Sequence, residues 1–110
     1  MASIDSFQIE GALVNIAINA VAATHPEGTI RFSMRVDGGH VLFEVENSGE
    51  RIRDDDLTRI FEPFFTTKHS GTGLGLAIAR GVARSHGGDL WVSKNHDGAV
   101  AFTLSVHSGN

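Results

Sequence analysis

The segment that most constrains this chain is Gly71-Thr72-Gly73-Leu74-Gly75-Leu76, which runs directly into an apolar helical pattern. Glycine lets a backbone approach a ligand closely, because it has no side chain to hold the ligand away. Where such a segment opens a helix, the unpaired amide groups of the first turn favour an anion such as phosphate. The aromatic block Phe61-Glu62-Pro63-Phe64-Phe65-Thr66-Thr67-Lys68 precedes these glycines. The two together predict a phosphate-binding loop rather than a plain surface loop.

The rest of the chain has the pattern of helices and hairpins. Apolar residues recur at helical spacing in the longer segments and alternate in the shorter ones, with glycine or proline between most of them. The expected helices are 6–24, 54–60 and 74–86, and the expected strands are 29–36, 40–46, 90–93 and 99–106. The first strand is expected to be half-buried through Ile30, Phe32, Met34 and Val36. Hairpins with helices on one face predict an α/β (α+β) two-layer sandwich with a mixed, mostly antiparallel sheet.

Composition narrows the classes of function. With 110 residues, the chain is expected to form a single domain, 1–110. Its net charge of -4 disfavours a nucleic-acid partner, which normally meets a basic face. The absence of cysteine excludes disulfides and thiolate metal sites. We find no apolar run near membrane-spanning length and no signal-peptide pattern, and therefore expect a cytoplasmic domain without direct membrane contact.

The aromatic block and the glycines together resemble one family, the ATP-binding catalytic domain of sensor histidine kinases. Residues 61–68 resemble the F box of that family, and residues 71–75 resemble its second glycine box. The nearest subgroup by this pattern is the nitrogen-regulatory type. The resemblance spans about Ser6 to Val106 and implies the Bergerat ATP-binding fold, in which ATP lies between the helical layer and a lid, here residues 66–72. The Rossmann alternative fails, because no strand precedes the glycines and their spacing is G-x-G-x-G.

Two asparagines, Asn15 and Asn19, lie four residues apart and therefore share one face of the first helix. The surrounding segment resembles the N box of the family, which implies that Asn19 coordinates Mg²⁺ and that Asn15 lies nearer the phosphates. An amide oxygen together with phosphate oxygens suits Mg²⁺, which prefers oxygen ligands and keeps several waters. In the ATP-hydrolysing relatives a glutamate stands at the place of Asn15 and activates water. An amide cannot take up that proton, so the site is expected to hold ATP for transfer.

Residues 45–52 fall where the family has its first glycine box, D-x-G-x-G, whose aspartate accepts a hydrogen bond from the adenine amino group. This chain has Asn47 in place of the aspartate, retains Gly49, and has Arg51 in place of the second glycine. The amide oxygen of Asn47 still accepts, but a neutral acceptor contributes about 1 kcal/mol less than a charged one. An amide also turns over and donates, which weakens selection against guanine.

The remaining nucleotide-site residues are also implied by the resemblance. Lys68 is expected either to meet the terminal phosphates as a point charge or to be a solvated loop lysine. Phe64 is expected to anchor the lid, and Thr103 to lie near the adenine. The hydrophobic side chains of Ile52 and Leu76 are expected to line the adenine pocket. The other implied positions belong to the lid and the second glycine box: Thr67, Gly71, Thr72, Gly73, Leu74 and Gly75.

None of the six histidines has the sequence context of a metal ligand or of the phospho-acceptor histidine of the family. Catalytic residues are therefore not expected within this chain, and the helical dimerisation domain with its phospho-acceptor is expected on another part of a larger kinase. The expected ligands are ATP and Mg²⁺, with the dimerisation domain as partner and a response regulator acting indirectly. The alternative is a degenerate kinase domain that serves as a docking or regulatory module, which Asn47 and Arg51 favour.

Overall fold

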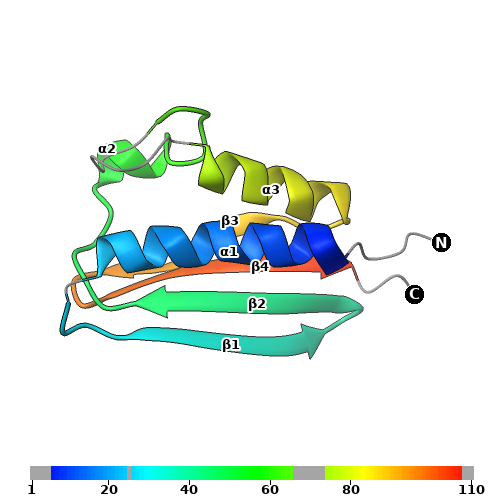
Figure 1. Cartoon of the computed structure of the whole chain (residues 1–110), viewed down its shortest axis with the longest axis horizontal. Coiled ribbons are helices and arrows are strands. Elements are labelled where there is room, and N and C mark those ends of the chain that lie inside the picture. The colour runs from blue at the N-terminus through cyan, green and yellow to red at the C-terminus, as the bar shows by residue number, and fades with distance from the viewer. Residues whose placement is uncertain (1–5, 25, 66–73, 108–110) are drawn as a thin grey trace.

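The computed structural model describes residues 6–24, 26–65 and 74–107. These residues form helices α1 (Ser6–Ala23), α2 (Asp54–Leu57) and α3 (Gly75–Ser85) and strands β1 (Ile30–Asp37), β2 (His40–Asn47), β3 (Leu90–His96) and β4 (Ala99–His107). The four strands pair in the order β1-β2-β4-β3, with α1 and α3 side by side on one face of the sheet (Figure 1). The expected two-layer sandwich is confirmed. The sheet is antiparallel throughout the described strands rather than mixed.

Two tight turns set the register of the hairpins. Gly38 and Gly39 join β1 to β2 with positive φ angles of 57° and 83°, and Asp97-Gly98 joins β3 to β4. The second turn is shorter than expected, because Asn95 and His96 still pair with β4. Helix α2 ends at Leu57 rather than at residue 60, and only turns follow it.

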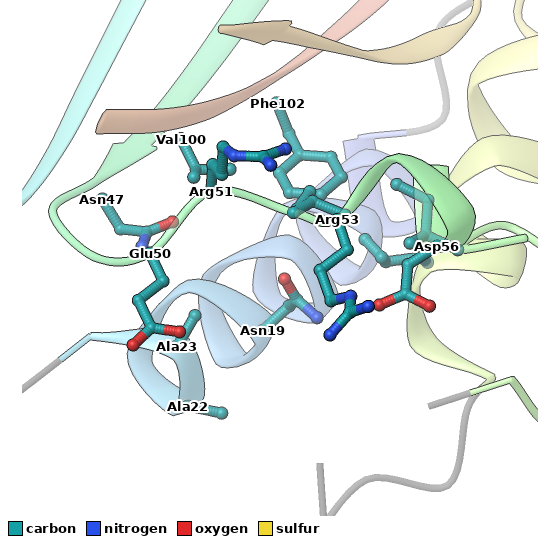
Figure 2. Close-up of a pocket in the computed structure, with 13 residues that line it drawn as sticks. Asn19, Ala22, Ala23, Asn47, Glu50, Arg51, Arg53, Asp56, Val100 and Phe102 are labelled. Carbon is teal, nitrogen blue, oxygen red and sulfur yellow. The ribbon is translucent and has the colours of Figure 1, made fainter. Parts of the chain in front are cut away.

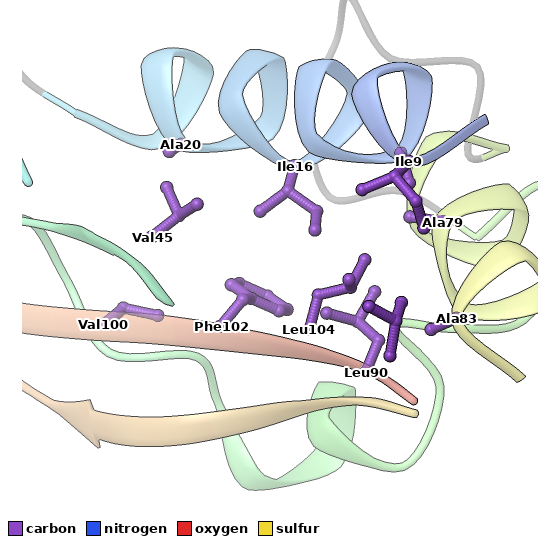
Figure 3. Packing of buried hydrophobic residues seen from close by; sticks show 12 residues of the cluster. Ile9, Ile16, Ala20, Val45, Ala79, Ala83, Leu90, Val100, Phe102 and Leu104 are labelled. Atoms are coloured by element: carbon purple, nitrogen blue, oxygen red, sulfur yellow. The ribbon is translucent and has the colours of Figure 1, made fainter. Parts of the chain in front are cut away.

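The core lies between the two helices and the helix-facing side of the sheet (Figure 3). Side chains alternate across a strand, so β4 places every second residue in this core. Helix α1 contributes residues at helical spacing, and α3 contributes two alanines that let it approach closely. The principal members are Ile9, Ile16, Ala20, Val45, Ala79, Ala83, Leu90, Val100, Phe102, Leu104 and Val106.

The burial expected for β1 holds for Ile30, which is partly buried against the core, but is wrong for the other three residues. Phe32, Met34 and Val36 are 61%, 66% and 70% exposed, although they pair with the apolar residues of β2. The physical reason is position: β1 is the edge strand, and α1 packs over β2 rather than over β1 (Figure 1). Alternation shows that these residues share one face, but it does not show whether a helix covers that face.

The expectation that the chain has no apolar run near membrane-spanning length is wrong. Among the described residues, helix α1 is the one helix long and apolar enough to cross a membrane, with 18 residues and a mean hydropathy of 1.2. Four of its residues have a different role here, whereas Phe7, Val14, Ile18 and Val21 are exposed. Ile9, Ala12, Ile16 and Ala20 are buried against the sheet and α3, as expected for the core helix of a two-layer fold. Length and hydropathy alone therefore do not make α1 a membrane span.

The C-terminal end of α3 is held by a carboxylate. Asp89 accepts hydrogen bonds from Arg80 at 3.0 Å and from Arg84 at 3.1 Å, and its own carboxylate also caps the Leu90 amide at 2.8 Å. Burial alone raises the pKa of Asp89, but the hydrogen bonds from Arg80, Leu90 and Arg84 outweigh burial and hold the pKa below its usual value. These contacts join the last turns of α3 to the start of β3.

Asp89→Asn is therefore expected to lower the free energy of unfolding by about 1 kcal/mol at pH 7, a small value because the side chain is partly exposed and screened. A lowered pKa stabilises the fold above the unfolded-state value of about 3.9, and this stabilisation is lost as the pH falls through the folded-state pKa. Urea unfolding of the two proteins should thus converge in acid. The control is Asp37→Asn at the end of β1; an equal loss of stability in both variants would contradict the assignment.

Candidate functional site

A cavity of about 460 Å³ opens between the end of α1, the segment after β2, and β4 (Figure 2). This volume is within the range of about 300–1,000 Å³ that is usual for small-molecule sites. Four of the residues expected from the sequence line it: Asn19, Asn47, Ile52 and Leu76. Nine lining residues were not among the expected site residues: Ala22, Ala23, Glu50, Arg51, Arg53, Asp56, Ile60, Val100 and Phe102.

The segment that forms one wall of the cavity is fixed to the β3–β4 hairpin. The amide of Asn95 brackets Ile52, accepting from its N–H at 2.7 Å and donating to its carbonyl at 2.9 Å. The backbone N–H of Gly98 donates to the carbonyl of Gly49 at 2.8 Å. Gly49 itself passes so close to α1 that a Cβ atom would lie 2.9 Å from the Ala23 carbonyl oxygen. These contacts hold the wall in place without a helix or strand.

Asn47 ends β2 at the inner end of this wall. Asn47 is 2% exposed, and its Nδ2 atom donates to the Ser48 carbonyl at 3.1 Å. This bond orients the amide, because Nδ2 is engaged by the chain itself. The Oδ1 atom accepts no hydrogen bond from the described residues, so it remains an acceptor for a ligand N–H.

Asn19 and Asn15 lie on successive turns of α1. Asn19 lines the cavity, whereas Asn15 lies against the start of α3, where a Cβ atom on Gly75 would be 3.6 Å from the Asn15 Cβ. Helix α3 begins at Gly75 after the N-cap residue Leu74, which makes no side-chain cap. The N-terminal, positive end of α3 therefore lies beside Asn15, an arrangement that favours an anion.

Aromatic contacts connect this site to the core. The Phe61 ring packs edge-on against Phe102, a lining residue, with centroids 6.3 Å apart. The Arg80 guanidinium also lies over the Phe61 ring, 4.5 Å from its centroid. Phe64 differs from the expectation of an anchoring residue: it is 74% exposed, has a φ of 70°, and does not line the cavity.

Thr103 is not brought to the cavity, which corrects the expectation that it lies near the adenine. Val100 and Phe102 face the helices, and the pleat of β4 therefore turns Thr103 to the opposite face. There its hydroxyl donates to the Ser93 Oγ at 2.8 Å. The predicted strand is confirmed, but the residue that lines the cavity is the neighbouring Phe102, whose side chain is on the other face of the strand.

Several expected positions lie outside the described residues: Thr67, Lys68, Gly71, Thr72 and Gly73. They stay predictions. Within the described residues no group of three or more histidine or acidic side chains could hold a metal ion. The half-buried amide of Asn19 does fit Mg²⁺, because a metal shared with phosphate oxygens and water needs few protein ligands.

Some of the lining residues that were not expected carry a signal in the sequence, and others carry none. Val100 and Phe102 continue the alternation of Leu104 and Val106, so the strand pattern alone could have indicated them. The charged residues Arg53 and Asp56 fall in an irregular segment and a helix of only four residues, where no periodicity fixes their direction.

Comparison with known proteins gives a consistent result. The family model described as "Histidine kinase-, DNA gyrase B-, and HSP90-like ATPase" matches residues 4–110. The sensor histidine kinase ZraS of Escherichia coli strain K12 is 37% identical over 100 residues, which are 91% of this chain and 22% of ZraS. The aerobic respiration control sensor protein ArcB of the same strain is 37% identical over 112 residues, which cover 94% of this chain and 14% of ArcB. The chain thus spans about a fifth or less of these relatives.

Solved structures agree with the sequence relatives. The catalytic domain of histidine kinase ThkA superposes with a TM-score of 0.85 at 37% identity, covering 94% of this chain and 68% of that one. The mycobacterial sensor histidine kinase MprB gives a TM-score of 0.82 at 28% identity, covering 94% and 74% of the respective chains.

Proposed function

Because this chain belongs to the family of histidine kinase-, DNA gyrase B- and HSP90-like ATPases, as a catalytic domain of the sensor histidine kinase type, we propose that it binds Mg²⁺-ATP and presents the γ-phosphate to a histidine on a separate domain. The observation that carries this proposal is the shared cavity. Asn19 and Asn47, far apart in the sequence, line one hollow together with apolar side chains. A concave site with a few convergent polar groups is the usual form of a small-molecule site.

The roles of the residues follow from their positions. The base would lie against the apolar wall of Ile52, Leu76 and Phe102, with its amino group donating to the Asn47 Oδ1. The phosphates would then extend past Asn19 towards the start of α3. Magnesium, when bound, neutralises phosphate charge, and phosphoryl transfer depends mainly on such neutralisation and on positioning.

The position of Asn15 supports transfer rather than hydrolysis. Its amide lies beside Gly75, towards which the phosphates are proposed to extend, and an amide does not act as a general base at neutral pH. At the position of Asn15, a water molecule near the γ-phosphate would therefore meet an amide rather than a carboxylate. The phosphate remains available for a histidine that approaches from outside.

The proposed partners are a helical dimerisation domain that carries the phospho-acceptor and, through it, a response regulator. Two relatives give support by their own complexes. ThkA has been solved with the response regulator protein TrrA, at a TM-score of 0.78 to this chain, and full-length ShkA has been solved with AMPPNP at the same score. We also infer a cytoplasmic location, where ATP is supplied, for this domain of a larger kinase.

Calorimetry with ATP in excess Mg²⁺ tests the proposal and is expected to show saturable binding. Labelled ATP alone should leave the isolated chain unlabelled, because its histidines lack the phospho-acceptor context. A helical domain that carries such a histidine, added in trans, should acquire acid-labile label. Absence of ATP binding would instead favour the second candidate, a docking module, which the asparagine at position 47 and the arginine at position 51 suggest.

Asn47→Asp is expected to raise ATP affinity about five- to tenfold, because a charged acceptor replaces a neutral one. The hydrogen bond from Nδ2 to Ser48 also bears on GTP: turning the amide over to meet the guanine carbonyl would break it. We therefore expect the unmodified protein to prefer ATP already, and the variant to widen the gap. Parallel titrations with ATP and GTP measure both effects, and equal selectivity in the two proteins would show that this side chain does not contact the base.

A further inference from the structure

We propose that Arg53 is a phosphate-binding residue of this site and supplies a positive charge from the segment that precedes α2. The inference rests on the proposed nucleotide function. It concerns a residue that lies outside the glycine and asparagine motifs, and it starts from the charges of the cavity wall.

The cavity has two chemically different ends. Asn47 ends β2 at one end, whereas Arg53 and Asp56 belong to the start of α2 at the other, with Asn19 between them in the view of Figure 2. The guanidinium of Arg53 extends in that view towards the side chains of Asn19 and Asp56, away from Asn47. A ligand whose base meets Asn47 would therefore present its phosphates to Arg53.

The two arginines of the wall differ in their partners. Arg51 forms an exposed ion pair with Asp54 at 3.5 Å. Arg53 makes no ion pair or side-chain hydrogen bond with any residue in the described part of the chain, although three aspartates follow it. Its extended backbone, with φ of -66° and ψ of 147°, sets it apart from the helical turn that carries those aspartates.

A cation among the lining residues would offset the acidic side chains of the cavity. Glu50 and Asp56 both line the cavity and would repel a polyphosphate. Arg53 is a lining cation that forms no ion pair with a carboxylate of the described residues, although its guanidinium extends towards Asp56 in Figure 2. A guanidinium is always charged and binds two phosphate oxygens at once, so it suits a phosphate-binding position.

The experiment compares ligands that differ only in their phosphates. ATP, ADP and adenosine are titrated in Mg²⁺ into the wild type and into Arg53→Gln, with NMR shifts to follow weak binding. We expect ATP and ADP to bind about five- to tenfold more weakly to the variant, a range typical of a partly exposed charged contact. Adenosine should bind both proteins equally, and the difference for ATP should shrink as salt screens the charge.

Two further variants keep the result unambiguous. Arg53→Lys retains the charge and should recover part of the ATP affinity, whereas Arg35→Gln removes an exposed arginine from β1 and should leave all three affinities unchanged. Equal ATP affinity in Arg53→Gln and wild type, or a parallel loss of adenosine, would overturn the inference while leaving the proposed function intact. A wild type that binds neither ATP nor adenosine would overturn the proposed function itself.

Discussion

Asn19→Ala is expected to abolish the magnesium-dependent part of ATP binding while leaving the fold intact. Asn19 lines the cavity from α1 and is the side-chain metal ligand that the resemblance assigns. Loss of an outer partner of a metal ligand already weakens metal binding about 10- to 100-fold, and loss of the ligand itself should cost at least as much. Calorimetric titrations with ATP, in Mg²⁺ and in EDTA, measure the effect.

The matched variant is Asn15→Ala, which removes the same amide one turn earlier on the same helix. Asn15 lies against the start of α3, near the proposed path of the phosphates, and is not a proposed metal ligand. Its loss should therefore weaken ATP binding to a similar degree with and without Mg²⁺. Asn19→Ala should instead match the wild type in EDTA. Unchanged Mg²⁺-ATP affinity in Asn19→Ala would show that the metal is held elsewhere.

Gly88→Ala is expected to destabilise the fold by about 3 kcal/mol or more, the upper range for overpacking. A methyl group at this position would fall well inside contact distance of the Ser105 backbone carbonyl, which cannot rotate away as a side chain can. Gly88 also donates to the Ala83 carbonyl at 2.9 Å, and Ser105 donates to the Asp89 carbonyl at 2.8 Å, so the backbone is fixed on both sides. A domain with a total stability of about 5–15 kcal/mol would lose a large part of it.

Urea unfolding, followed by the fluorescence of the single tryptophan, Trp91, measures this loss. The control is Gly81→Ala on the exposed side of α3, where a Cβ atom meets nothing within 4 Å. That change should stabilise the domain by about 0.5–1 kcal/mol, because alanine loses less backbone entropy in a helix. Equal midpoints for wild type and Gly88→Ala would show that the joint between α3 and β4 is looser than the structure has it.

The order of helices and strands could be predicted from the sequence because each element repeats its own signal. Strand β4 alternates along its length, α1 shows helical spacing, and the glycine turns delimit the hairpins. Three errors have a common cause. The burial of Phe32 depends on how far the helices extend across the sheet, the direction of Thr103 depends on which face they cover, and the length of α2 depends on its packing. A linear pattern does not contain that information.

The candidate site divides in the same way. Asn19, Asn47, Ile52 and Leu76 lie within recognisable motifs, and these four line the cavity. The supporting contacts of the site are long-range: the Asn95 amide reaches across to Ile52 from another hairpin. Nothing in the sequence near Asn95 indicates that its partner is a backbone forty-three positions away. The role proposed for Arg53 could not be predicted from the sequence for a related reason, since it depends on which side chains line the cavity and which arginines form ion pairs.

Helix α3 is subject to different constraints at its two ends. At its C-terminal end, substitutions at Gly87, Gly88 or Asp89 disturb the chain itself, because backbone and carboxylate contacts meet there. At its N-terminal end, a methyl group on Gly75 would meet Asn15 at 3.6 Å, an ordinary van der Waals contact. Substitutions at the N-terminal end of this helix could therefore change ligand binding without destabilising the fold, whereas the C-terminal end tolerates almost no substitution.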